Sequence, residues 1–115
     1  MLPTSSRTTP ALPAIAVRNL KAKLDANEPI VLLDVRTPEE FTNGHVAGAR
    51  SLPLAELEAR LDDLAKDAAI YCICLWDGRS QRACDLLQRA GFTTVFDVTG
   101  GMAAWQQAGL PITRG

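Results

Sequence analysis

The chain has 115 residues, 47% of them hydrophobic, and a formal net charge of -1 at neutral pH. This length suits one domain, and the hydrophobic content is enough for an ordinary core. The small net charge gives no reason to expect nucleic acid or an anionic membrane as a partner. No hydrophobic run is long enough to cross a bilayer.

The first residues differ from the rest in composition. Residues 1–14 are rich in proline, serine and threonine, and they contain no continuous hydrophobic stretch of the kind found in signal peptides. We therefore predict a flexible N-terminal arm over residues 1–14 and a single folded domain over residues 15–115.

Two hydrophobic patterns alternate along the remaining chain. Spacings of three and four predict amphipathic helices, and short continuous runs predict strands that are buried on both faces. Thr37, which is followed by proline and acidic residues, is typical of a helix start. In chain order the expected elements are a helix over residues 17–26, a strand over 30–35, a short helix from Thr37 to Asn43, a turn over 45–49, a strand at 51–52, a helix over 54–66, a strand over 69–74, a helix that Ser80 caps and Gly91 ends, a strand over 93–98, a turn at Gly100 and Gly101, and a helix over 103–108.

Strands alternate with helices throughout this order. The alternation predicts an α/β domain with a mostly parallel sheet and right-handed crossovers. In such a sheet the carboxyl ends of the strands lie at one edge, and α/β proteins place their chemistry there.

The chain has three cysteines, Cys72, Cys74 and Cys84. An odd number does not suggest a disulfide framework, and Cys72 and Cys74 are too close in sequence to form a CxxC pair. With one histidine in the chain, we expect no metal site. Free thiols fit a reducing compartment, so the cytoplasm is the expected location.

Cys74 ends a predicted strand, and residues 75–79 separate it from Ser80, the predicted cap of the next helix. Three features favour the thiolate form of Cys74: the positive end of that helix, the backbone N–H groups of the loop, and the charge of Arg79. Gly78 gives the loop the backbone freedom it needs. We predict that Cys74 is a nucleophile in an anion-binding loop.

The alternative is that Cys74 is a small buried hydrophobic residue, as cysteines at strand ends often are. The C-x4-R-S spacing at a strand-to-helix turn supports the catalytic interpretation without excluding the structural one. Cys72 and Cys84 are expected in the core. Other polar residues fall at the same sheet edge, and their favoured role is to stabilise turns through ion pairs or hydrogen bonds; they are Asp34, Arg36, His45 and Arg50.

Five segments follow one another in a characteristic order. They are Leu33 to Arg36 with Glu39 to Phe41, Gly44 to Ala49, Cys74 to Ser80, Gly100 to Met102 with Trp105, and Ala108 to Pro111. Together they resemble the rhodanese family of sulfurtransferases in its single-domain form, over residues 17–111. The resemblance implies a three-layer α/β domain around a central five-stranded, mostly parallel sheet.

The resemblance also implies a reaction. Cys74 would take the outer sulfur of thiosulfate or another persulfide donor, and an acceptor such as cyanide or a thiol would remove it. No metal or organic cofactor is expected. The implied loop residues that hold the sulfur are Leu75, Trp76, Asp77, Gly78, Arg79 and Ser80, with Asp34, Arg36 and Arg50 in support.

Two details bear on the substrate. The related phosphatase and arsenate-reductase branch of the family has a loop one residue longer than Cys74 to Arg79, so loop length favours sulfur chemistry. Asp77 stands where many members have glycine, and its charge should weaken the binding of dianionic thiosulfate. We therefore expect weak turnover with thiosulfate and a preference for a thiol-borne or protein-borne donor.

Other functions remain open from the sequence. The chain could be a sulfur-relay module that accepts sulfur from a partner protein and turns over small molecules poorly. It could also be a non-catalytic interaction domain, although the presence of Cys74, Arg79 and Ser80 argues against that role.

Overall fold

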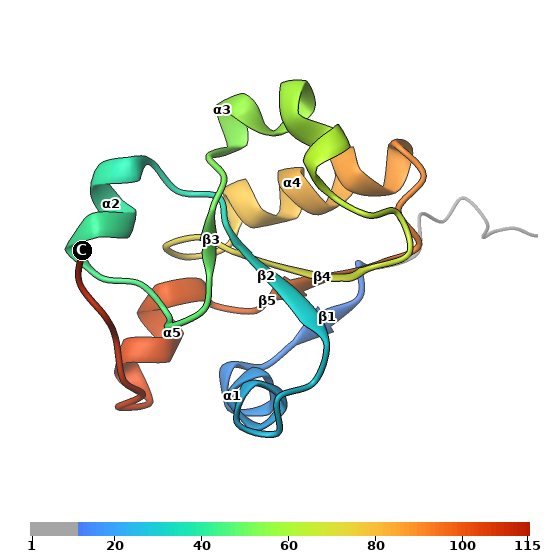
Figure 1. Ribbon diagram of the computed structural model, residues 1–115. Coiled ribbons are helices and arrows are strands. Elements are labelled where there is room, and N and C mark those ends of the chain that lie inside the picture. Colours follow the sequence, from blue (N-terminus) through green and yellow to red (C-terminus); the bar gives the residue numbers. More distant parts are fainter. Residues whose placement is uncertain (1–11) are drawn as a thin grey trace, which may run out of the picture.

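The computed structural model describes residues 12–115 and contains one five-stranded, all-parallel sheet (Figure 1). The strand order is β1-β5-β4-β2-β3. The strands are β1 (Ala14–Ile15), β2 (Ile30–Asp34), β3 (Arg50–Ser51), β4 (Ala69–Ile73) and β5 (Thr94–Val98). The helices are α1 (Val17–Asp25), α2 (Pro38–Asn43), α3 (Leu54–Leu57), the 3-10 helix η2 (Glu58–Asp63), α4 (Gly78–Arg89) and α5 (Gly101–Gln107).

Helices cover both faces of the sheet and make three layers. In Figure 1, α3 and α4 lie above the sheet and α1 and α5 lie below it, while α2 stands at one end. Each face has its own core. One core contains Leu33, Leu57 and Leu87, and the other contains Leu20 and Trp105. The α/β domain with a five-stranded parallel sheet that the sequence predicts is therefore confirmed.

The central strands are the continuous hydrophobic runs of the sequence. β4 lies between β2 and β5, so both its edges are hydrogen-bonded and both its faces are covered. The register places Asp34 beside Ile73 and Cys72 beside Asp97. The carboxyl ends of β2, β4 and β5 therefore meet at one edge of the sheet, where Cys74 follows β4.

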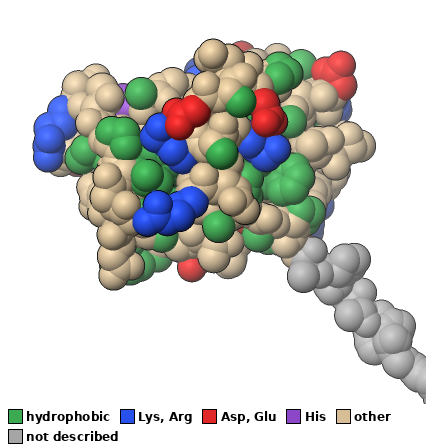
Figure 2. All heavy atoms as spheres, turned by 90° about the horizontal axis from the view of Figure 1, so that it is seen from below, with side chains coloured by type: hydrophobic (Ala, Val, Ile, Leu, Met, Phe, Trp, Pro, Cys, Tyr) green, Lys and Arg blue, Asp and Glu red, His purple; other side chains and the backbone are tan. Residues whose placement is uncertain are grey.

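The outer surface below the sheet is mixed in character. Figure 2 shows lysine, arginine, aspartate and glutamate side chains interspersed with hydrophobic ones on the face that carries α1 and α5. Within residues 12–115, no helix has both the length and the hydrophobicity to span a membrane.

The prediction of one helix over residues 54–66 is wrong, because the structure has two short helices there. It consists of α3, which is only one turn long, and the 3-10 helix η2, with non-helical dihedral angles at Arg60. Arg60 forms ion pairs with Glu56 and Asp63 across this kink. After the kink Leu64 takes an extended conformation and is buried, so the leucine spacing reflects two short elements that cover one core.

Most other elements end within one residue of the sequence prediction, and the larger differences lie at the starts of α4 and α5. The helix expected to be capped by Ser80 begins at Gly78, so Ser80 lies inside it, and Asp77 occupies the cap position. The last helix begins at Gly101 rather than at residue 103. The arm expected over residues 1–14 falls mostly on residues 1–11, outside the described part of the chain, and Ala14 belongs to β1.

The start of α5 packs directly on the segment that follows Cys74. The N–H groups of Met102 and Ala103 donate to the carbonyl oxygens of Cys74 and Leu75, at 2.8 and 2.9 Å. Gly101 has φ +56°, and a Cβ atom there would lie 2.3 Å from the Cys74 carbonyl oxygen. Only glycine fits this position, both for its backbone conformation and for the space it has.

We expect Gly101→Ala to destabilise the protein by about 2–3 kcal/mol, because the new methyl group overlaps three loop carbonyls and the residue keeps a left-handed conformation. Urea unfolding would measure the loss. Gly48→Ala is the matched control, since Gly48 also has a positive φ but has open space around it. That control should cost about 1 kcal/mol from backbone strain alone. Equal losses in the two variants would show that the contact with the loop is unimportant.

Candidate functional site

Cys74 directly follows β4 and is buried, with 1% of its surface exposed. Its sulfur accepts a hydrogen bond from the backbone N–H of Ser80 at 3.3 Å. The thiol in turn donates to Ser80 Oγ at 3.3 Å. The first turn of α4 is therefore aimed at the sulfur, which places the partial positive charge of the helix end beside it.

In the loop between Cys74 and α4, the carbonyl groups and the N–H groups differ in their hydrogen bonding. The carbonyls of Cys74 and Leu75 are engaged by α5. Among the described residues, no hydrogen bond uses the backbone N–H groups of residues 75–79 as donors. These donors are the ones that could bind an anion or a sulfur atom attached to Cys74.

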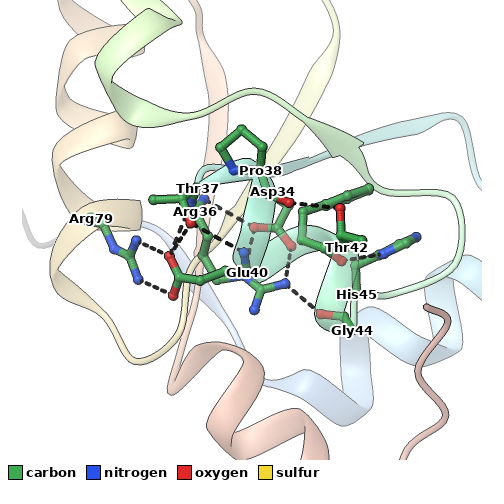
Figure 3. A network of polar contacts seen from close by, with 10 residues as sticks. Asp34, Arg36, Thr37, Pro38, Glu40, Thr42, Gly44, His45 and Arg79 are labelled. Carbon is green, nitrogen blue, oxygen red and sulfur yellow. Dashed lines mark hydrogen bonds and ion pairs between the residues drawn. The ribbon is translucent and has the colours of Figure 1, made fainter. Parts of the chain in front are cut away.

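Arg79 is held by Glu40 across the site. Its Nη1 and Nη2 atoms donate to the two carboxylate oxygens of Glu40 at 2.7 and 3.0 Å (Figure 3). The hydrogen bonds from Arg79 lower the pKa of Glu40 from 4.5 to about 2. Glu40 is also part of a capping box, because Thr37 bonds to it from the start of α2. The pair thus fastens α2 to α4 beside the loop, and the helix start predicted at Thr37 is confirmed.

Asp34 and Arg36 form a buried ion pair at the end of β2. Arg36 Nε and Nη2 lie 2.9 and 2.7 Å from the two Asp34 oxygens, and Nη2 also donates to the carbonyl of Gly44 (Figure 3). Both side chains are nearly inaccessible to solvent. These contacts match the turn-stabilising role favoured from the sequence, since the pair joins β2 to the end of α2.

His45 and Arg50 form no hydrogen bond with residues 74–80 in the part of the chain that the structure describes. The ring of His45 stacks on Phe41, and its Nδ1 lies 2.8 Å from the Phe41 carbonyl oxygen, which is the turn-stabilising contact that the sequence favours. Arg50 is exposed on edge strand β3 and forms no ion pair within residues 12–115.

The Asp77 side chain contacts the turn before α5. Its Oδ1 accepts a hydrogen bond from the backbone N–H of Gly100 at 2.9 Å. The carboxylate therefore ties the loop to the turn before α5, and the residue is half-buried. Next to it, Trp76 is 65% exposed and Leu75 is 36% exposed.

The other two cysteines belong to the core, as the sequence predicts. Cys72 and Cys84 are free and fully buried. The neighbouring Cys84 thiol, together with burial, raises the pKa of the Cys72 thiol well above its ordinary value. The raised pKa and the complete burial both disfavour the reactive thiolate form of Cys72.

Two residues that contact the loop were missed from the sequence. Glu40 has an unremarkable place in the first turn of a short helix, and nothing local indicates that it meets Arg79. Asp97 does give a signal, because it is an acidic residue between buried hydrophobic residues of strand β5. Its Oδ1 lies 2.5 Å from Ser80 Oγ, in the interior of the protein.

The geometry defines a class: a parallel α/β domain with a cysteine-centred loop between a central strand and a helix N-terminus. The rhodanese-like domain family matches residues 16–108, so the chain belongs to the rhodanese family. A sulfurtransferase of Allochromatium vinosum is 34% identical over 94 residues, which are 82% of this chain and 88% of that protein.

Two other similar proteins agree with this assignment. A Bacillus subtilis protein named "Putative sulfur carrier protein YrkF" is 36% identical over 101 residues, which are 88% of this chain but 55% of that protein. The chain thus spans little more than half the length of this relative. The solution structure of the rhodanese-like domain from the Anabaena protein Alr3790 has a TM-score of 0.83 and 32% identity, covering 91% of this chain and 81% of that one.

We expect Glu40→Gln to lose at most about 1 kcal/mol of stability at neutral pH, because the ion pair with Arg79 is partly exposed. The difference from wild type should shrink as the pH falls from 4.5 to about 2. In that range the unfolded chain binds a proton at Glu40 before the folded protein does, so the wild type loses its advantage. Urea unfolding at several pH values measures the difference in stability. The control is Asp85→Asn, which removes an exposed ion pair with Arg89. A difference in stability that does not change with pH would contradict the lowered pKa of Glu40.

Proposed function

We propose that this protein is a sulfurtransferase that carries a sulfane sulfur as a persulfide on Cys74. The observation that carries the proposal is the setting of the sulfur, which faces the N-terminus of α4 and receives the Ser80 N–H at 3.3 Å. The unused N–H groups of residues 75–79 supply further donors for a second sulfur atom. Membership of the rhodanese family and relatives named as sulfurtransferase and sulfur carrier support it.

The reaction has two displacement steps. The Cys74 thiolate attacks the outer sulfur of the donor, and the donor's S–S bond breaks. With thiosulfate, sulfite leaves with the electron pair of that bond. An acceptor, which is cyanide or a thiolate, then attacks the outer sulfur of the persulfide, and Cys74 leaves as the thiolate.

The burial of Cys74 restricts what can react with it. Because only 1% of its surface is exposed, the reacting atom of a donor has to be small and reachable at the end of an unbranched group. The terminal sulfur of thiosulfate or of a persulfide meets this condition. Loop length also favours sulfur over a tetrahedral phosphate or arsenate centre, which makes phosphatase or arsenate-reductase activity the least favoured function.

The rim of the site favours a protein as donor or acceptor. Trp76 and Leu75 present exposed hydrophobic surface next to Cys74, and large exposed aromatic residues are typical anchors in protein interfaces. The Asp77 carboxylate beside them disfavours a small dianion. A sulfur-relay module with slow small-molecule turnover is therefore the second candidate, and a relative named as a sulfur carrier points the same way.

We expect intact-mass measurement after incubation with thiosulfate, or with a persulfide of a low-molecular-weight thiol, to show the gain of one sulfur atom. Cyanide should remove it as thiocyanate. Cys74→Ser should gain nothing, whereas Cys72→Ser and Cys84→Ser should behave as wild type because both thiols are buried in the core.

The outcome also separates the candidate functions. Rapid formation of thiocyanate over many turnovers indicates the enzyme, and a single loading with slow turnover indicates the relay module. A wild-type protein that takes up no sulfur from either donor would refute the persulfide proposal. Hydrolysis of an aryl phosphate, abolished by Cys74→Ser, would instead support phosphatase chemistry.

We expect Asp77→Asn to lower the apparent KM for thiosulfate by about threefold, because it removes a negative charge near the mouth of the site. Asparagine keeps an oxygen that can accept the Gly100 N–H, so the loop should stay in place. Asp77→Gly removes both the charge and the hydrogen bond and serves as the comparison. An unchanged KM in Asp77→Asn would show that the charge does not control donor choice.

A further inference from the structure

Asp97 is an acidic residue in the interior of the sheet. It lies on β5 opposite Cys72 of β4, and only 3% of its surface is exposed. Its Oδ1 lies 2.5 Å from Ser80 Oγ, and the same Ser80 oxygen lies 3.3 Å from Cys74 Sγ. Ser80 therefore joins a buried carboxyl group to the sulfur on which the proposed function depends.

The hydrogen bonds that link Cys74, Ser80 and Asp97 can all be donated in the same direction. The Ser80 hydroxyl has a single proton, which can go to Asp97 or to the Asp77 carbonyl oxygen at 2.7 Å. The Cys74 thiol donates to the Ser80 oxygen. When the hydroxyl donates to Asp97, both hydrogen bonds point from the thiol toward the carboxylate, which is the arrangement that a proton transfer requires.

We propose that Asp97 receives the Cys74 proton by way of Ser80 when the thiolate forms; the role of this step rests on the proposed function. The S–H bond of Cys74 breaks and its proton bonds to Ser80 Oγ, while the original Ser80 proton passes to Asp97 Oδ1. The products are a thiolate, an intact serine hydroxyl and a neutral carboxylic acid, so atoms and charge balance. Asp97 acts on Cys74 only by way of Ser80, so it is a positioning residue and not a catalytic residue that touches the reacting sulfur.

The surroundings of Asp97 suit a proton acceptor. The neighbouring groups are Ser80 and Gln81 from α4, Asp77 from the loop, Cys72 from β4, and the Pro13 carbonyl, which accepts the Asp97 N–H. Within residues 12–115, no lysine, arginine or histidine forms an ion pair with Asp97, and Arg79 is bound to Glu40. Burial raises the pKa of Asp97 above its ordinary value of 3.8, although the hydrogen bond from Ser80 and the nearby Gln81 side chain partly oppose this rise.

A carboxylate that only stood near the sulfur would have the opposite effect. Its negative charge would repel a thiolate, so its removal would make Cys74 more reactive. A carboxylate that receives the proton makes the thiolate available below the pH at which the thiol would ionise into solvent. The sign of the change therefore separates the two roles.

The test is the rate at which iodoacetamide alkylates Cys74, followed by peptide mass spectrometry across the pH range. At about pH 6 we expect Asp97→Asn to react at least about tenfold more slowly than wild type, and at about pH 9 we expect the two rates to converge. Asp85→Asn, which removes an exposed carboxylate from the same helix, should match wild type at every pH. An equal or faster rate in Asp97→Asn at the lower pH would overturn the proposal.

Ser80 variants test the path of the proton. Ser80→Ala should be as slow as Asp97→Asn at the lower pH, and combining the two changes should add nothing, because both interrupt one chain. Additive losses would overturn the relay. If urea unfolding shows that Asp97→Asn is not folded, Asp97→Ser, which is polar but carries no base, replaces it with the same expected results. Alkylation needs no sulfur donor, so this test can be interpreted even if the persulfide experiment fails.

Discussion

The contact between α5 and the backbone that follows β4 is the constraint on which the site depends. Two N–H groups of the first turn of α5 bind the carbonyls of Cys74 and Leu75, and Gly101 allows the approach because it has no side chain. With these carbonyls committed to α5, the loop N–H groups are left available for another partner. A purely local feature, the path of five residues, is thus fixed by a helix from the end of the chain.

Side chains secure the same loop from its other sides. Arg79 binds Glu40 on α2, Ser80 binds Asp97 on β5, and Asp77 binds the backbone of Gly100. Each tie reaches a different part of the fold. In the proposed persulfide mechanism, a site held in this way would need little rearrangement when charge develops on the Cys74 sulfur, and electrostatic stabilisation of a reacting group requires such preorganisation.

The sequence was informative wherever local patterns decide the structure. Continuous hydrophobic runs marked the central strands, and the residues around Thr37 marked a helix start. The cysteine, arginine and serine of the loop could also be found, because their spacing is local. Asp97 stands out as an acidic residue in a buried strand, but no local pattern shows that Glu40 and Asp97 meet the loop, because 39 and 17 residues of chain separate them from their partners. The leucines of residues 54–66 misled because two short helices on one core reproduce the spacing of a single long one.

The sheet has another property that follows from its strand lengths. Both edge strands, β1 and β3, contain only two residues, whereas the three inner strands contain five each. Short edge strands leave few unpaired backbone groups with which a strand from a second copy of the chain could pair. The domain therefore confines its long, hydrophobic and most aggregation-prone strands to the middle of the sheet, where both edges of each strand are already paired.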